Sequence, residues 1–284
     1  MRLLVLGRTG QLATELRRRA PPGTDVVAVG REGADLMDPE GCARLVAGAR
    51  ADAVVLAAAW TAVDRAEAEE AAATVANGEA PAAVARAAAA RGLPLVHLST
   101  DYVFDGSGTR PWLPSDPTGP LNAYGRSKFR GEQGVRAAGG PHAILRTSWV
   151  FSAHGANFVR TMLRLGAERA ELRVVADQVG GPTPAAALAD ACHLAAWALR
   201  DGAPSGTHHL AGAPHASWAD LAGAVMAETG LPARVLPVAT ADWPTPAPRP
   251  LNSRLDGGSA RAVLGLAPPD WREGLRDVVR ELLA

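Results

Sequence analysis

The sequence predicts an α/β protein: a Rossmann-type, doubly wound parallel sheet with a smaller C-terminal α+β lobe. Two observations support this prediction. In the first two-thirds of the chain, short apolar runs alternate with segments of helical periodicity, as in repeated β-α-β units. After about Phe151 the alternation loosens, and a proline-rich stretch interrupts it. We therefore expect one domain over residues 1–150 and a lobe mainly over residues 151–284, with later segments returning to the first domain.

The expected strands of the first domain are short runs in which polar and apolar residues do not alternate. This pattern is typical of strands buried on both faces of a parallel sheet. Helical segments separate the runs, so each strand can return to the same sheet. The strands are expected at Leu3–Leu6, Asp25–Val29, Ala53–Ala57, Leu95–Leu98 and Ala143–Thr147. The helices are expected at Gln11–Arg19, Pro39–Ala49, Ala80–Ala90 and Tyr124–Arg136.

The second half of the chain predicts longer helices with a few short strands between them. The prolines between Trp243 and Pro250 predict a loop, because proline has no backbone N–H and a fixed φ. The helices are expected at Asn157–Gly166, Pro184–Leu199, Ser217–Thr229 and Trp271–Leu283. The strands are expected at Leu172–Val175, Thr207–Leu210 and Arg234–Val238.

Composition restricts the classes of partner. The chain has 29 basic and 29 acidic residues, a balance that argues against binding to nucleic acid or to a membrane surface. No apolar run has the length of a membrane span or of a secretion signal, so we expect a cytoplasmic protein. Cys42 and Cys192 are far apart and lie in expected helices, so we expect small buried side chains and neither a disulfide nor a metal site.

A glycine-rich turn follows the first expected strand and opens the first expected helix. Its sequence over residues 7–13, GRTGQLA, has the pattern G-x-x-G-x-x-A. Gly7 and Gly10 allow a tight turn in which backbone N–H groups reach a pyrophosphate, and the helix N-terminus favours that anion. In the first turn of a β-α-β unit, this motif predicts a dinucleotide site.

The end of the second expected strand indicates which dinucleotide binds. An NAD site usually has Asp or Glu there, to bond the ribose 2′-hydroxyl. Here Arg31 follows the strand, which favours NADPH with Arg31 near the 2′-phosphate and leaves NADH possible. The alternative is that Arg31 is a solvated residue beside Glu32. Asp35 and Leu36 come just after, where a side chain can cover the adenine.

Three residues with complementary chemistry are expected at the carboxyl edge of the sheet. Tyr124 and Lys128 have i, i+4 spacing and share a helix face. A lysine ammonium beside a phenol lowers the pKa of the phenol, which makes Tyr124 a proton donor to a carbonyl near neutral pH. Thr100 follows the fourth expected strand, in the crevice where open α/β sheets bind ligands. Its hydroxyl can hold the same carbonyl oxygen.

Further motifs follow in order along the chain. They are AAWTAVDRAE at 58–67, STDYVFDG at 99–106, RTSWVF at 146–151, DQVGGPT at 177–183 and RPLNSRLD at 249–256. With the glycine turn and the Tyr-x-x-x-Lys pair, they make the chain similar to the dTDP-4-dehydrorhamnose reductase family, which is a family of extended short-chain dehydrogenases. The resemblance implies NAD(P)H-dependent reduction of the 4-keto group of a dTDP-4-keto-6-deoxysugar, with dTDP-4-dehydro-L-rhamnose as the first candidate.

The resemblance also implies roles for single residues. Thr100, Tyr124 and Lys128 would be catalytic, and Lys128 would also bond the nicotinamide ribose. Thr100, Asp101 and Trp149 would face the sugar, while Arg249 and Asn252 would help to hold the nucleotide diphosphate. The dinucleotide would contact Gly10, Gln11, Leu12, Asp35, Leu36, Ala59, Trp60, Thr61, Tyr124 and Lys128, in addition to Gly7 and Arg31.

Some members of the family that this chain resembles form dimers through magnesium, which carboxylates near the first and a later helix hold. Glu15 matches one of these positions, but Ala186 stands where the other carboxylate is expected. We therefore expect no metal site, Glu15 as a solvated helix charge, and either a monomer or a homodimer. Ala13, in place of a third glycine, and Trp60, in place of the family's usual Tyr, are smaller departures.

Two rival classes remain open. An epimerase or dehydratase of nucleotide sugars keeps the Tyr and Lys but recycles a tightly held nicotinamide. A dehydratase also needs an acid pair after the catalytic hydroxyl residue, and here Asp101 is followed by Tyr102. Some proteins with this resemblance are regulatory subunits of methionine adenosyltransferase, which bind a dinucleotide without turnover. The complete Thr100, Tyr124 and Lys128 set favours a reductase.

Overall fold

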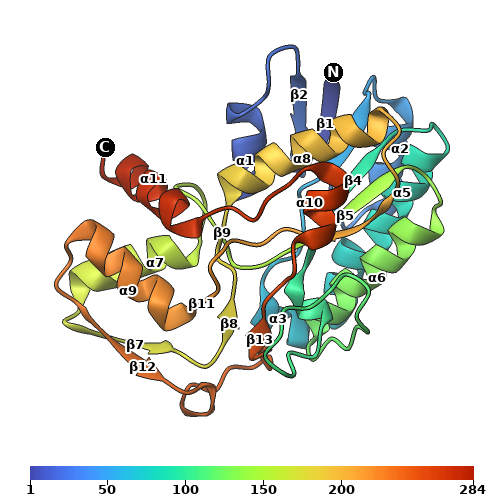
Figure 1. Ribbon diagram of the computed structural model, residues 1–284. Helices are drawn as coiled ribbons and strands as arrows, with labels where there is room; N and C mark the ends of the chain where they lie inside the picture. Colours follow the sequence, from blue (N-terminus) through green and yellow to red (C-terminus); the bar gives the residue numbers. More distant parts are fainter.

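The computed structural model describes all 284 residues. Its larger part is a six-stranded sheet with the order β10-β5-β4-β3-β1-β2, and every neighbouring pair of strands is parallel (Figure 1). The strands are β1 (Arg2–Leu6), β2 (Asp25–Val29), β3 (Ala53–Leu56), β4 (Leu95–Thr100), β5 (His142–Thr147) and β10 (Gly206–His209). This topology confirms the predicted doubly wound α/β fold.

Helices cover both faces of this sheet, and each face has its own apolar core. On one face lie α1 (Gln11–Arg18), α8 (Ala185–Arg200) and α10 (Gly258–Leu264). On the other lie α2 (Pro39–Gly48), α5 (Ala80–Ala89) and α6 (Ala123–Ala137). β1 and β3 are buried on both faces, as predicted. β2 is only partly buried, because it is an edge strand.

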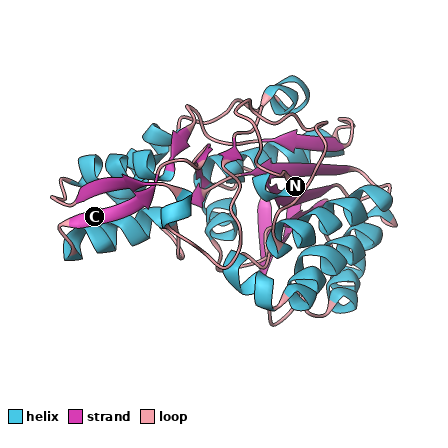
Figure 2. Cartoon of the chain, turned by 90° about the horizontal axis from the view of Figure 1, so that it is seen from below, coloured by secondary structure: helices cyan, strands magenta, loops and turns pink.

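A second apolar core, built from residues after Val150, lies beside the carboxyl edge of the sheet (Figure 2). It contains α7 (Phe158–Glu168), α9 (Trp218–Thr229) and α11 (Trp271–Leu283), with the strand pair β7 (Glu171–Val175) and β12 (Arg234–Val238). Short strands connect the two parts: β6 (Val150–Phe151), β8 (Val179–Gly180), β9 (Thr183–Pro184), β11 (Ala216–Ser217) and β13 (Asn252–Ser253). Within residues 151–284, therefore, α8, β10 and α10 belong to the large sheet.

The expected helices and strands are present with ends shifted by one or two residues, but several short elements were not predicted. Two of them lie between β3 and α5, namely α3 (Val63–Ala68) and α4 (Glu70–Thr74). A π-helical turn, η1 (Val75–Glu79), then joins α4 to α5. Single turns of 3-10 helix also follow β4, at Asp101–Val103 (η2), and β12, at Thr240–Asp242 (η3). The proline-rich stretch after η3 is a loop, as predicted.

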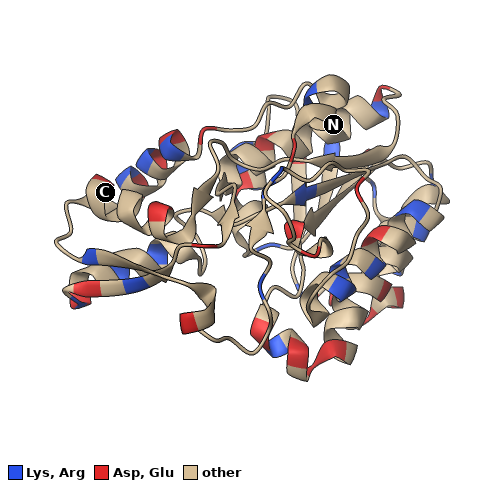
Figure 3. Ribbon diagram, turned by 60° about the horizontal axis from the view of Figure 1, so that its bottom comes forward, with Lys and Arg blue, Asp and Glu red and all other residues tan.

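Both cysteines are buried, as predicted, and burial raises the pKa of the Cys42 thiol to about 11. No helix is both long enough and apolar enough to span a membrane. Figure 3 shows basic and acidic residues interspersed along the outer helices, in keeping with the balanced composition.

Candidate active site

The glycine turn between β1 and α1 leaves helical N–H groups without a capping side chain. Gly7 has φ 124°, and a Cβ there would lie 3.1 Å from the Ala58 backbone nitrogen, so this position requires glycine. Gly10 is the N-cap of α1, and the first turn contains no acidic residue. The turn therefore fits the pyrophosphate of a dinucleotide, because the free backbone N–H groups at the positive end of the helix can donate to that anion.

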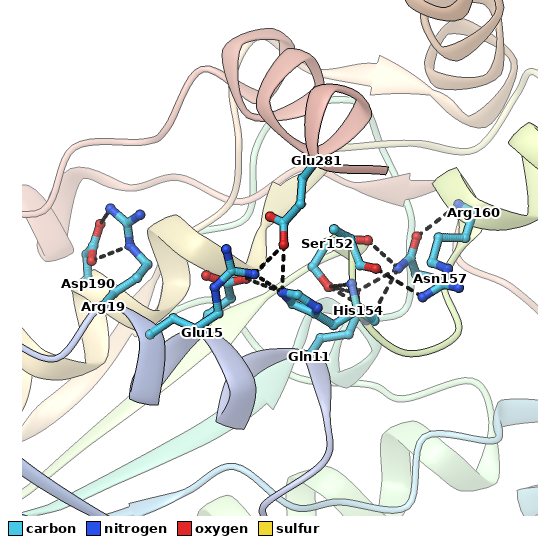
Figure 4. A network of polar contacts seen from close by, with 11 residues as sticks. Gln11, Glu15, Arg19, Ser152, His154, Asn157, Arg160, Asp190 and Glu281 are labelled. Atoms are coloured by element: carbon cyan, nitrogen blue, oxygen red, sulfur yellow. Dashed lines mark hydrogen bonds and ion pairs between the residues drawn. The ribbon is translucent and has the colours of Figure 1, made fainter. Parts of the chain in front are cut away.

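Two residues of this turn use their side chains for structure. Gln11 donates from Nε2 to the Val150 carbonyl (3.3 Å), and its Oε1 accepts from Ser152 and Asn157 (Figure 4). Leu12 is buried in the core between α1 and the sheet. Contacts of these two residues with a dinucleotide would thus come from the backbone, and the Gln11 side chain ties the turn to the segment after β5.

At the end of β2, Glu32 pairs with Arg8 of the glycine turn and not with Arg31. Arg8 Nη1 lies 2.6 Å from Glu32 Oε1. Arg31 is exposed and forms no ion pair. Asp35 accepts a hydrogen bond from the Met37 N–H (3.0 Å), and Leu36 is buried. The strand end therefore carries a carboxylate, Glu32, that is paired with an arginine of the glycine turn.

A buried asparagine that the sequence did not indicate supports the segment Ala59–Trp60–Thr61 after β3. Asn77, on the π-helical turn, accepts from the Trp60 N–H (2.8 Å) and donates to the Trp60 carbonyl (2.9 Å). It also donates to Ser127 Oγ (3.0 Å) on α6. Asn77 thus joins the proposed dinucleotide segment to the helix that carries Tyr124. A π-turn, which is frequent at functional sites, is the structural signal for it.

Thr100, Tyr124 and Lys128 meet at the carboxyl end of β4. Thr100 is the last residue of β4, and its hydroxyl donates to Asp101 Oδ1 (3.0 Å). Asn122 caps α6 by accepting from the Gly125 N–H, which places Tyr124 in the first turn. Hydrogen bonding to Thr100 acts on the Tyr124 hydroxyl and opposes the effect of burial on its pKa.

The protonation of this group differs from the sequence-based expectation. The Lys128 ammonium donates to the Leu98 carbonyl (2.6 Å), and burial lowers its pKa to about 8. Burial raises the pKa of Tyr124 to about 12 instead of lowering it. The expected lowering is wrong for this geometry, because desolvation dominates and no lysine charge acts on the phenol. Tyr124 therefore keeps its proton at neutral pH.

The composition of the chain also sets Lys128 apart from the other basic residues. Lys128 is the only lysine in a chain that has 29 basic residues, so every other basic side chain is an arginine. Arginine cannot lose its proton in a protein, whereas a buried lysine can. Among these 29 basic residues, the one side chain that can lose its proton therefore lies in the Tyr-x-x-x-Lys motif.

A buried ion pair lies behind Thr100, Tyr124 and Lys128. Glu132 on α6 binds Arg146 of β5 through two hydrogen bonds (2.7 and 2.8 Å) and accepts from Ser99 Oγ (2.6 Å). Both charged residues are at most 1% exposed. This pairing fixes α6 against β4 and β5 and therefore fixes the positions of Lys128 and Thr100.

Asp101 is the buried acid beside the Thr100 hydroxyl. Its side chain is buried, and its Oδ2 has no hydrogen-bond partner. Burial raises the pKa of Asp101 to about 6, although the hydrogen bond from Thr100 to its Oδ1 opposes that rise. A buried acceptor without a partner costs free energy in the protein alone, so Asp101 is suited to accept a bond from a ligand hydroxyl.

Trp149 connects the end of β5 with the smaller lobe. It is the only non-glycine residue with positive φ (50°), a conformation that costs free energy and is often found at functional sites. Its ring stacks on Trp218 of α9, with centroids 3.7 Å apart. A Cβ at Gly180 would lie 3.0 Å from the Trp149 ring. Packing of the lobe therefore holds Trp149 in the strained backbone conformation.

Of the two residues expected at the diphosphate, Arg249 is partly exposed and Asn252 is not. Arg249 pairs with Asp64 (2.9 Å) and donates to the Ala247 carbonyl. The Asn252 amide donates to the Ser107 and Arg110 carbonyls, and its Oδ1 accepts from Arg254. The Asn252 side chain therefore holds the loop together, and its expected contact with the diphosphate stays a prediction.

Glu15 is not the solvated charge that the sequence suggested. It is buried and lies 3.0 Å from His154 Nε2, with Arg18 and Glu281 beside it (Figure 4). His154 follows the β6 segment, and Glu281 comes from α11, so sequence distance concealed this cluster. The carboxylates of Glu15 and Glu281 share Arg18 and His154 as partners.

Comparison with known proteins agrees with this geometry. A family model described as the RmlD substrate binding domain matches residues 1–284. A dTDP-4-dehydrorhamnose reductase from Burkholderia thailandensis is 45% identical over 297 residues, covering 100% of both chains. A probable dTDP-4,6-dihydroxy-2-methyloxan-3-one 4-ketoreductase from Streptomyces antibioticus is 42% identical, covering 100% of this chain and 96% of that protein.

Among solved structures, a dTDP-4-dehydrorhamnose reductase from Bacillus anthracis in complex with NADP is 34% identical, with a TM-score of 0.93 and coverage of 99% of both chains. The family model and the relatives thus extend over the glycine turn, the catalytic group and the smaller lobe alike. The chain belongs to the dTDP-4-dehydrorhamnose reductase family.

Proposed function

We propose that this protein reduces the 4-keto group of a dTDP-4-keto-6-deoxysugar with NADPH, and that dTDP-4-dehydro-L-rhamnose is its substrate. The observation that carries the proposal is the convergence of Thr100, Tyr124 and Lys128 at the end of β4. Beside them lies a glycine turn with uncapped helical N–H groups. Full-length relatives named as reductases of this kind support it, as does the NADP complex of a related reductase.

The bound nicotinamide supplies the hydride that reduces C4 of the sugar. Tyr124 donates its proton to the oxygen that gains negative charge, and a phenol of pKa about 12 remains protonated until that moment. The Thr100 hydroxyl steadies the same oxygen. Lys128 bonds the nicotinamide ribose. Gly7, Gly10 and the first turn of α1 hold the pyrophosphate, and Trp60 and Thr61 line the path of the dinucleotide.

The sugar end is proposed to bind between the sheet and the lobe. Asp101 accepts from a sugar hydroxyl through its unpartnered Oδ2, and Trp149 packs on the sugar ring. Arg249 faces the diphosphate. We place the protein in the cytoplasm, with the nucleotide sugar as its partner. Neither a metal ion nor a second subunit is required for the chemistry proposed.

A second sugar is a specific alternative, because the Streptomyces antibioticus relative is named for a different 4-keto substrate. The test is to mix purified protein with each of the two dTDP-4-keto sugars and to follow the loss of NADPH absorbance. Oxidation with the rhamnose precursor supports the first proposal, and oxidation only with the other sugar supports the second. Dinucleotide binding without oxidation by any 4-keto sugar would refute both.

A further inference from the structure

The Arg8–Glu32 ion pair lies beside the expected adenosine end of the dinucleotide. The Gly7 N–H donates to the Val29 carbonyl (2.8 Å), which holds the glycine turn against the end of β2. In this fold the adenosine ribose lies at the end of the second strand. Arg8 and Glu32 therefore come together at the strand end where the adenosine ribose is expected, although the chain separates them by a helix and a strand.

Glu32 reaches this place because it folds back over Gly30. A Cβ at Gly30 would lie 2.5 Å from Glu32 Oε2, so the glycine leaves room for the carboxylate. Arg8 Nη1 then holds Glu32 Oε1 at 2.6 Å. The side chains of Arg8 and Glu32 are 48% and 58% exposed, so both can exchange partners with a ligand.

The other charged groups nearby are less suited to the 2′-position. Arg31 extends into solvent without an ion-pair partner. Asp35 is occupied by the Met37 N–H, and Asp38 caps α2 and pairs with Arg44. A 2′-phosphate at this strand end would therefore meet both side chains. Arg8 would attract the phosphate, and Glu32 would repel it.

We propose that the Arg8–Glu32 pair sets the dinucleotide preference of this protein. Arg8 is the main partner of the 2′-phosphate of NADPH, and Glu32 competes with that phosphate for Arg8. With NADH, Glu32 instead accepts a hydrogen bond from the ribose 2′-hydroxyl. The pair thus lets one site take both dinucleotides and limits its preference for NADPH. This inference rests on the proposed dinucleotide-dependent function.

The test is calorimetric binding of NADP⁺ and NAD⁺ to the wild type, to Glu32→Gln and to Arg8→Gln, without any sugar. Glu32→Gln should bind NADP⁺ about three- to tenfold more tightly and NAD⁺ no more tightly. Arg8→Gln should bind NADP⁺ about tenfold more weakly and change NAD⁺ binding less than about twofold. Glu40→Gln, which removes a similarly exposed carboxylate on α2, is the matched control and should change neither.

Three further measurements decide between outcomes. In the Arg8→Gln background, Glu32→Gln should increase NADP⁺ affinity by less than it does in the wild type, because the arginine for which Glu32 and the phosphate compete is absent. Adenosine 2′,5′-bisphosphate and AMP should repeat the NADP⁺ and NAD⁺ pattern, since they contain only the adenosine end. Arg31→Gln should have the smaller effect of the two arginine variants.

The inference is overturned if the NADP⁺ to NAD⁺ affinity ratio stays within about twofold in both Glu32→Gln and Arg8→Gln, or if only Arg31→Gln lowers it. Failure of the reductase proposal gives a different result. In that case the dinucleotides bind with the expected changes, and no 4-keto sugar is reduced.

Discussion

At the residue scale, burial decides the protonation of Lys128 and Tyr124. The Lys128 ammonium donates a hydrogen bond to the Leu98 carbonyl. Burial of the ammonium lowers its pKa from 10.5 to about 8. Burial also disfavours the charged form of Tyr124, which is the phenolate, and therefore raises its pKa to about 12. Near neutral pH the pair is therefore an ammonium and a phenol, which is the state from which a proton can be donated.

Lys128 should give the enzyme an alkaline limit. As the pH rises through about 8, Lys128 loses its proton and kcat/KM should fall, because the neutral amine binds the nicotinamide ribose more weakly than the charged ammonium does. Because it is the only lysine, NMR of protein with ¹³C-labelled lysine should show one side-chain signal that titrates near that pH. A signal that stays unchanged up to pH 10 would contradict the assignment.

Replacing Tyr124 with Phe removes the proton donor and keeps the ring. General acid catalysis is worth about 10²–10⁴-fold, so kcat should fall by that factor. Dinucleotide binding, measured by calorimetry, should remain within about twofold. Tyr102→Phe is the matched control, since its ring lies 5.7 Å from that of Tyr124 and it has no proton-donating role here. Wild-type turnover in Tyr124→Phe would exclude the mechanism.

At the element scale, the large regular elements could be predicted from the sequence and the small connecting ones could not. β1, β3 and β4 were predictable because burial on both faces requires unbroken apolar runs. The segment that contains α3, α4 and η1 is rich in alanine and glutamate and has no apolar stripe, so its short helices gave no periodic signal. Asn77 was missed for another reason, because its partners Trp60 and Ser127 are distant in the sequence.

The π-helical turn should contribute to stability through Asn77. Asn77→Ala removes the two bonds to the Trp60 backbone and the bond to Ser127 and leaves buried groups without partners. The free energy of unfolding should fall by about 1–3 kcal/mol in urea denaturation. Ser127→Ala, which removes one of these partners, should cost less. Equal stability of Asn77→Ala and the wild type would show that the turn does not depend on this side chain.

The site residues separate in the same way into predictable and unpredictable ones. Thr100, Tyr124 and Lys128 lie in motifs, and the topology brings them together as expected. Glu32 and His154 could not be assigned, because their roles depend on a side chain folding back over Gly30 and on the approach of α11. Sequence spacing carries no information on such contacts.

At the scale of the whole molecule, the balance of buried titratable groups sets the stability at acidic pH. His97, His193, His208 and His209 are buried, and burial lowers the pKa of each below 6.5. Asp101 acts in the opposite direction, because burial raises its pKa to about 6. The two effects occur in overlapping ranges of pH and can be separated by mutation.

The free energy of unfolding should decrease as the pH falls below about 6.5. The unfolded chain then binds protons at its histidines, while the folded state keeps them neutral, at about 1.4 kcal/mol for each pH unit and each histidine. Asp101 partly offsets this loss between about pH 6 and 4, since its folded state binds the proton first. Asp101→Asn should therefore lose stability more steeply in urea denaturation over that range. A profile parallel to that of the wild type would contradict the assignment for Asp101.

The lobe and the sheet act together in the whole molecule, because Trp149 at the end of β5 stacks on Trp218 of α9. The sugar is proposed to bind at this junction, and the dinucleotide on the sheet side. The central claim is that hydride passes between them to C4 of the sugar, with Tyr124 supplying the proton.

The most direct test of that claim is to run the reaction with NADPH deuterated at nicotinamide C4, using each stereoisomer of the label in turn, and to locate the deuterium by NMR of the nucleotide sugar. The account predicts that one stereoisomer places a single deuterium on C4 of the product and that solvent deuterium enters no carbon of the ring. Deuterium from solvent at a ring carbon, or a product that retains no label from either stereoisomer, would contradict direct hydride transfer and with it the reductase.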